Sequence, residues 1–187
     1  MANLYVALIH YPVVNKNGKV IASAVTNLDI HDISRAVKTF GARSFYIVTP
    51  LEDQRALADR IVSYWVKGAG ATYNPKRKEA LKLISIKPFL EDVIEDIYAD
   101  SGKRPEIVVT CAKQQPQNLS YKAFQQQLKS GNPYLLAFGT AWGLSEAFLA
   151  DADYILDPIT GNTGYNHLSV RSAAAIILDR LMREETM

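Results

Sequence analysis

Two glycine-bearing loops in the last third of the chain are the first candidates for a binding site. The segments FGTAWG (138–143) and DPITGNTG (157–164) each follow a short apolar run and together hold four of the chain's ten glycines. Because glycine carries no Cβ, such loops let backbone amides and carbonyls approach a ligand closely. Neither segment matches the G-x-G-x-x-G or G-x-x-x-x-G-K-[ST] phosphate-binding patterns. We therefore expect a ligand that carries no phosphate.

Arg35 is the charged residue with the most direct functional interpretation. It lies in the segment DIHDISRAVKTFGA (29–42), which follows the first apolar run and has the pattern of a helix. It is either a solvated helix arginine or a guanidinium that binds a phosphate with two parallel hydrogen bonds. The run Lys76–Lys78, with Lys82 and Lys87, leaves a similar choice between a solvated face and a patch for a nucleic-acid backbone.

The remaining chemistry-bearing side chains form no recognisable catalytic or metal-binding pattern. Cys111 ends an apolar run, and we interpret it as a buried, inert thiol. The possible soft or imidazole metal ligands are scattered without paired spacing, so we predict no metal site; they are Cys111, His10, His31 and His167. The polar run 165–167, with Ser169, either caps the last helix or lines the glycine loops.

Five short apolar runs predict the strands that would position these residues. Most are continuous rather than alternating, which is typical of strands covered on both faces in a parallel sheet. The runs are 4–9, 44–49, 106–111, 134–139 and 153–157. In such sheets ligands bind beyond the carboxyl ends of the strands. The glycine loops and a third segment, CAKQQPQN (111–118), all follow strands there, so we expect the three loops to form one site.

Helical patterns alternate with these strands, and the alternation predicts an α/β domain with a doubly wound, mostly parallel sheet. The expected helices are 32–40, 51–66, 88–100, 120–129, 144–152 and 168–185. Ser120 and Gly131 are suitable cap and stop residues for the fourth of them. A hairpin with Asn17-Gly18 at its turn is expected after the first strand. The apolar side chains of the last helix are expected in the core, and its small residues would also allow packing against a second copy.

Composition favours one cytoplasmic domain that spans 1–187. The chain has 187 residues, a formal charge of +2 and a single cysteine, so any phosphate-binding surface must be a local patch and no internal disulfide can form. The apolar start does not have the pattern of a signal peptide, because it lacks a basic region and has His10 and Pro12 within the apolar stretch. No run reaches the ~18 apolar residues of a membrane span, so we expect no membrane partner.

The segment from 135 to 181 resembles the C-terminal knot region of the SPOUT (SpoU–TrmD) RNA methyltransferases. The family pattern is a strand, a Gly-x-x-x-Gly loop with GLS, a helix, an Asp before a short strand, a Pro-x-x-Gly loop and a helix that opens on L-S-V-x-x-A. This chain supplies Gly139, Gly143-Leu144-Ser145, Asp153, Pro158–Gly161, Leu168-Ser169-Val170, Ala173 and Ala174. The segment that contains Arg35 and Gly41 is similar to the family's first motif. The likeness is greatest to stand-alone bacterial proteins described as predicted RNA methyltransferases.

Two positions depart from the SpoU-type pattern. Ala141 stands where those members carry a glutamate, and His167 stands where they carry an asparagine, with Asn166 one residue earlier. The departures argue against the ribose 2′-hydroxyl target of SpoU-type enzymes. They leave the cofactor loops intact, since these act largely through backbone.

The resemblance implies a C-terminal trefoil knot, an S-adenosylmethionine site in it, a homodimer and an RNA substrate, a tRNA or rRNA nucleotide. It implies that Arg35 orients the RNA. The cofactor residues that it implies are Thr110, Cys111, Ala112, Phe138, Gly139, Thr140, Gly143, Leu144, Asp157, Ile159, Gly161, Tyr165, Asn166, Leu168, Ser169 and Ala173. Two alternatives stay open: a non-catalytic module that binds S-adenosylmethionine or a nucleoside, and an unrelated doubly wound enzyme that acts on a small metabolite.

Overall fold

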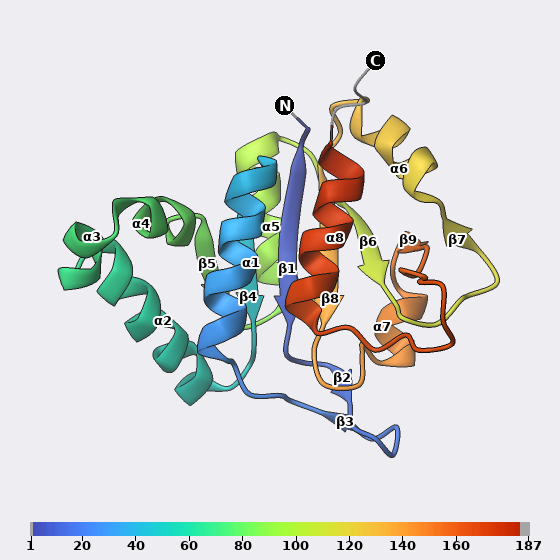
Figure 1. Ribbon diagram of the computed structural model, residues 1–187, viewed down its shortest axis with the longest axis horizontal. Helices are drawn as coiled ribbons and strands as arrows, with labels where there is room; N and C mark the ends of the chain where they lie inside the picture. Colours follow the sequence, from blue (N-terminus) through green and yellow to red (C-terminus); the bar gives the residue numbers. More distant parts are fainter. Residues whose placement is uncertain (1, 184–187) are drawn as a thin grey trace.

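A seven-stranded parallel sheet forms the centre of the computed structural model, which describes residues 2–183 (Figure 1). The strand order is β5-β4-β1-β8-β6-β9-β7, and every neighbouring pair is parallel. The strands are β1 (Leu4–Ile9), β4 (Phe45–Val48), β5 (Ile84–Lys87), β6 (Glu106–Thr110), β7 (Asn118–Leu119), β8 (Tyr134–Gly139) and β9 (Tyr154–Leu156). The five predicted strands are confirmed, and the two outermost strands, β5 and β7, were not predicted.

Helices cover both faces of the sheet, as the doubly wound prediction requires. They are α1 (Asn27–Phe40), α2 (Glu52–Val66), α3 (Ala69–Tyr73), α4 (Pro75–Leu81), α5 (Leu90–Ser101), α6 (Tyr121–Leu128), α7 (Glu146–Ala150) and α8 (Val170–Met182). In Figure 1, α1 and α8 lie side by side in front of β1 and β8, while α5 lies behind the sheet.

The central strand β1 shows why its sequence is continuously apolar. All six of its side chains are buried. Because successive side chains point to opposite faces, Leu4, Val6 and Leu8 join the cluster that contains α1 and α8. The alternate positions, Tyr5 among them, join a second cluster with α5 and α7. A strand between two cores has no polar face.

The helices that flank the site have local start and stop signals. Thr26 caps α1 by accepting a hydrogen bond from the Asp29 N–H, and Gly41 ends it with a φ of 74°. Ser169 caps α8 by accepting from the Ser172 N–H. The capping role that we considered for Ser169 is therefore confirmed. Helix α1 begins at Asn27, five residues before the predicted start, because Thr26 provides the cap.

The apolar face of α8 belongs to the core of the same chain. Ala174, Ile177, Leu178 and Leu181 are all buried. They pack in the cluster that contains α1, so the core interpretation of this face is confirmed and these four side chains are not available to a second copy. An ion pair between Arg171 and the carboxylates of α1 links the two helices at their exposed edge.

Two regions differ from the predicted elements. The segment from 69 to 81, where only a basic run was noted, forms the short helices α3 and α4; Asn74 caps α4 and Pro75 occupies its first turn. The expected hairpin is present as β2 (Val13–Val14) and β3 (Val20–Ile21), which pair antiparallel, with Gly18 at a φ of 74° in the turn. No helix among residues 2–183 is both long and apolar enough to span a bilayer.

Candidate functional site

Three loops meet at the carboxyl edge of the sheet. Strands β6, β8 and β9 are neighbours, so the loops that follow Thr110, Gly139 and Leu156 leave the sheet at the same edge. The side chain of Asn166 donates a 2.8 Å hydrogen bond to the Ala112 carbonyl, which joins the last of these loops to the first. This arrangement confirms that the three loops lie together.

The loop after β8 is a tight turn that requires glycine at its first position. A Cβ at Gly139 would lie 2.8 Å from the Leu144 backbone nitrogen, closer than real Cβ atoms come to backbone. Gly143 has a φ of 109°, which only glycine adopts readily. Ala141 has a φ of 52°, a left-handed conformation that costs a residue with a Cβ about 1 kcal/mol or more. Backbone strain of this kind tends to occur at functional sites.

The same loop is attached to the segment after β1 by backbone hydrogen bonds. The Val14 N–H donates to the Gly143 carbonyl at 2.9 Å, and the Trp142 N–H donates to the Val14 carbonyl at 3.1 Å. The Ser145 N–H donates to the Pro12 carbonyl at 3.2 Å. The hairpin predicted after the first strand therefore supports the glycine loop.

A partly buried chain of side-chain hydrogen bonds fixes Thr140 at the start of the loop. The Thr140 hydroxyl donates to the Ile9 carbonyl at 3.1 Å, and the Ser23 hydroxyl lies 2.5 Å from Thr140 Oγ1. His10 Nδ1 lies 2.9 Å from the Ser23 hydroxyl oxygen. Since the Thr140 proton points to Ile9, Ser23 donates to Thr140, and His10 donates from Nδ1 to Ser23. No sequence pattern indicates this chain of contacts, because its residues lie far apart and only their types can be noted.

His10 is held in its neutral form. Its side chain is 0% exposed, and Nε2 has no hydrogen-bond partner among the described residues. Burial lowers its pKa from 6.5 to about 4, and a backbone contact at Ala24 offsets only part of this effect. His10 therefore acts here as a buried hydrogen-bond donor and holds no charge at neutral pH.

The rim of the site is exposed and aromatic. Trp142 and Tyr165 are 66% and 73% exposed, and each places its ring centroid 6.4 Å from that of His167. The whole segment 161–169 is exposed, including Leu168. Exposed apolar surface beside glycine-rich backbone fits a ligand that combines a flat ring with hydrogen-bonding groups and no phosphate. Adenosine has this chemistry.

The predicted cofactor residues differ in how far their side chains are exposed. Phe138 and Leu144 are buried in the core, so only their backbone could reach a ligand, and Ile159 packs against the core from the loop. Cys111 is half-buried rather than buried as we predicted, and its sulfur accepts from the Lys113 N–H at 3.4 Å. The other residues lie at the ends of strands, on the loops or on the first turns of α8; they are Thr110, Ala112, Gly139, Thr140, Gly143, Asp157, Gly161, Tyr165, Asn166, Leu168, Ser169 and Ala173.

Arg35 lies away from these loops in the chain, on the exposed side of α1. It is one helical turn beyond His31, and α1 packs against α4 as well as α8. Burial, followed by the charge of Arg77, lowers the pKa of His31, and Arg35 acts in the same direction. The carboxylate of Asp32 acts in the opposite direction. Arg35 and Arg77 therefore both lie close enough to His31 to disfavour its charged form.

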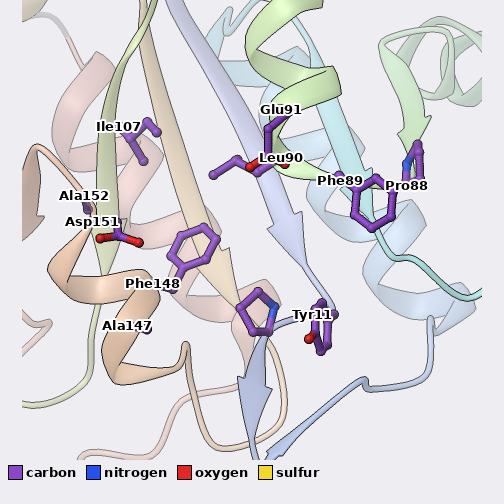
Figure 2. A pocket seen from close by; sticks show the side chains of 11 residues that line it. Tyr11, Pro88, Phe89, Leu90, Glu91, Ile107, Ala147, Phe148, Asp151 and Ala152 are labelled. Carbon is purple, nitrogen blue, oxygen red and sulfur yellow. The ribbon is translucent and has the colours of Figure 1, made fainter.

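A cavity of about 340 Å³ opens elsewhere, beside α5 and α7 (Figure 2). Tyr11, Phe89 and Phe148 contribute aromatic walls, and Glu91 and Asp151 lie among the lining residues. It contains none of the predicted cofactor residues. Among residues 2–183 no cluster of three or more His, Cys, Asp or Glu side chains could hold a metal ion.

A protein-family model described as SAM-dependent RNA methyltransferase matches residues 3–183. The chain belongs to this family. Members of this methyltransferase family use S-adenosylmethionine. A TrmH/SpoU tRNA modifying enzyme from Aquifex aeolicus superposes with a TM-score of 0.56 at 18% identity, over 98% of this chain and 75% of its own length. The SPOUT resemblance of the sequence is confirmed.

Two relatives in sequence extend the comparison. A protein of Oleidesulfovibrio alaskensis named tRNA (guanine-N(1)-)-methyltransferase is 47% identical over 180 residues, 96% of this chain and 42% of the relative. An uncharacterized protein of Aquifex aeolicus is 40% identical over 180 residues, 96% of this chain and 88% of the relative. The chain therefore spans less than half the length of the first relative, the one that is named as a methyltransferase.

Proposed function

We propose that this chain transfers the methyl group of S-adenosylmethionine to a nucleotide of RNA. The observation that carries the proposal is the meeting of three loops at one sheet edge, joined by Asn166 and Ala112, in a member of an RNA methyltransferase family. The guanine-N1 name belongs to a relative more than half of which lies outside the match. We therefore leave the target base and the target RNA open.

The cofactor site that we propose uses mainly backbone. Gly139 allows the end of β8 and the turn at Leu144 to approach each other, which shapes the floor of the site. The chain of hydrogen bonds from His10 through Ser23 holds Thr140 in place. Exposed backbone of 161–169 is available to hydrogen-bond the adenosine. When bound, S-adenosylmethionine supplies an electrophilic methyl group on its sulfonium.

Arg35 is the residue that we propose to bind the RNA. Its guanidinium is permanently charged, which suits a phosphate and excludes a role as general base. It lies on α1 rather than on the cofactor loops. We therefore propose that it serves the cofactor site of a partner subunit, so that a homodimer is needed for activity.

The homodimer and the trefoil knot are further parts of the proposal. Strand β9 lies beyond β6 towards the sheet edge, yet the chain returns after 157–169 to pack α8 against α1. The segment between β9 and α8 therefore passes the loop that follows β6, and this path supports a knot. Half-buried Ala173 and Ile176 on α8 are suitable interface residues. We place the protein in the cytoplasm, whose reducing environment suits a single free cysteine.

Calorimetry and a transfer assay test the function in two steps. We expect saturable binding of S-adenosylmethionine and of its demethylated product, and transfer of a labelled methyl group to RNA from cells that lack the protein. Binding without transfer to any RNA would support the non-catalytic alternative, for which Ala141 at the glutamate position is the motivating observation. Absence of binding would contradict both.

A further inference from the structure

A concentration of positive charge lies on the helices at the β5 edge of the sheet, far along the strand order from β9. The segment 67–82 carries five basic residues and one acidic residue, an excess of four positive charges. The whole chain has a net charge of only +2, so the rest of the chain is net negative. The basic residues are Lys67, Lys76, Arg77, Lys78 and Lys82. Figure 1 shows α2, α3 and α4 projecting as a group at this end.

These cations are not neutralised within the protein. Ion pairs among residues 2–183 use Arg43, Lys87, Arg171 and Arg183, and none involves a basic residue of 67–82. Helix α4 packs against α1, which brings the unpaired Arg35 to the same side. Unpaired cations on neighbouring helices attract a polyanion strongly, because each contact with a phosphate releases counterions.

Aromatic side chains are interleaved with the charges. The Arg77 guanidinium lies 4.4 Å from the centroid of the Trp65 ring, which also makes edge contacts with Tyr64 and His31 at 5.2 and 5.4 Å. A Cβ at Gly70 would lie 2.6 Å from the Trp65 ring, so α3 is pressed against this cluster. The cluster holds the exposed residues on a rigid base.

Tyr64 near the end of α2 and Tyr73 at the end of α3 expose much of their side chains to solvent. Tyr73 is 85% exposed and Tyr64 is 52% exposed. Tyrosine is a flat surface on which an unpaired base stacks, and stacking beside cations is the usual way in which proteins hold single-stranded nucleic acid. Solvation alone explains exposed lysines, but it does not explain an almost fully exposed tyrosine between them.

We propose that this surface, formed by Tyr64, Tyr73, Lys76, Lys78 and Lys82, binds a single-stranded segment of the RNA substrate. Bases stack on the tyrosines, and the lysines bind the phosphates. Arg35 lies on α1, which packs against α4, and continues the phosphate contacts. The inference rests on the proposed function in that the ligand is RNA. Binding of RNA is measured without cofactor, so this inference and the proposed methyl transfer can fail separately.

The test is fluorescence anisotropy of a labelled short single-stranded RNA, titrated with the full chain at several salt concentrations. The double variant Lys76→Ala, Lys78→Ala should weaken binding about tenfold. It should also reduce the steepness with which the logarithm of the association constant falls with the logarithm of the salt concentration by about 1.4, since each phosphate contact contributes about 0.7 on a single strand. Tyr73→Ala should weaken binding by about tenfold, whereas Tyr73→Phe, which keeps the ring, should bind like the parent.

The matched control is Lys122→Ala with Lys129→Ala, two exposed lysines on and just after α6. This variant should bind RNA like the parent. Equal binding by the parent and the Lys76, Lys78 and Tyr73 variants would overturn the proposal and favour an acidic protein as partner of this surface. An equal loss in the control, or no loss in Tyr73→Ala, would also overturn it. If the parent binds no single-stranded RNA, this inference is overturned, while the methyl-transfer assay with RNA from cells that lack the protein decides the proposed function separately.

Discussion

The buried imidazole of His10 makes the stability of the protein dependent on pH in a predictable way. His10 is fully buried at the end of β1 and donates from Nδ1 to Ser23. Its pKa is about 4 in the folded protein against 6.5 for an ordinary histidine. One pKa unit corresponds to about 1.36 kcal/mol, so the protonation of His10 should destabilise the folded state by about 3 kcal/mol.

The direction follows from proton binding. Between pH 6.5 and 4 the unfolded chain binds a proton at His10 and the folded protein does not, so stability rises with pH over this window. Above pH 6.5 the contribution of His10 is fully present. It is lost progressively as the pH falls towards 4. The magnitude is large relative to the usual stability of a domain.

Urea unfolding of the parent and of His10→Asn at several pH values between 7 and 4 measures the effect. Asn keeps a donor towards Ser23 but does not titrate, so the stability advantage of the parent should shrink by about 3 kcal/mol across the window. Ser23→Ala is the control, because it removes the partner and leaves the imidazole buried; it should keep the parental pH dependence. A constant difference between parent and His10→Asn at all pH values would refute the reasoning.

Three further predictions concern the loop, the RNA contact and the last helix. Gly139→Ala should lower S-adenosylmethionine affinity by more than about tenfold in calorimetry, since its Cβ would press on the Leu144 backbone; parental affinity would contradict the role of the turn. Arg35→Ala should keep cofactor affinity but reduce single-turnover methyl transfer about a hundredfold, a loss of about 3 kcal/mol, and Arg35→Lys should restore little. Equal rates for all three proteins would end the case for Arg35. Ile177→Glu should reduce the free energy of unfolding by more than about 2 kcal/mol, because Ile177 is 3% exposed in the protomer. Ile176→Glu should instead leave protomer stability largely intact and shift the light-scattering mass towards the monomer; a dimeric Ile176→Glu would argue against this interface.

The central strands were predictable because burial on both faces leaves a continuous apolar run, as in β1 and β8. The outer strands were not. The residues of β5 are only half-buried and include Ser85 and Lys87, and β7 has two residues. Pairing with a neighbour, rather than local pattern, makes them strands.

The site was predictable where its contacts depend on backbone and unpredictable where they join distant side chains. Gly139 and Gly143 could be recognised because tight turns demand glycine. The contact between Ser23 and Thr140 joins residues 117 positions apart, and no local pattern anticipates it. Helices α3 and α4 were missed because Gly68, Gly70 and Pro75 read as loop residues, although Gly70 is required by its contact with Trp65.

The most direct test of methyl transfer to RNA is mass spectrometry of the modified nucleosides in RNA from cells that lack this protein. We predict that one methylated nucleoside falls or disappears. It should return when that RNA is incubated with the purified parent and S-adenosylmethionine, and should not return with Gly139→Ala. An unchanged set of methylated nucleosides, together with no transfer to RNA from the deletion strain, would contradict the proposed function.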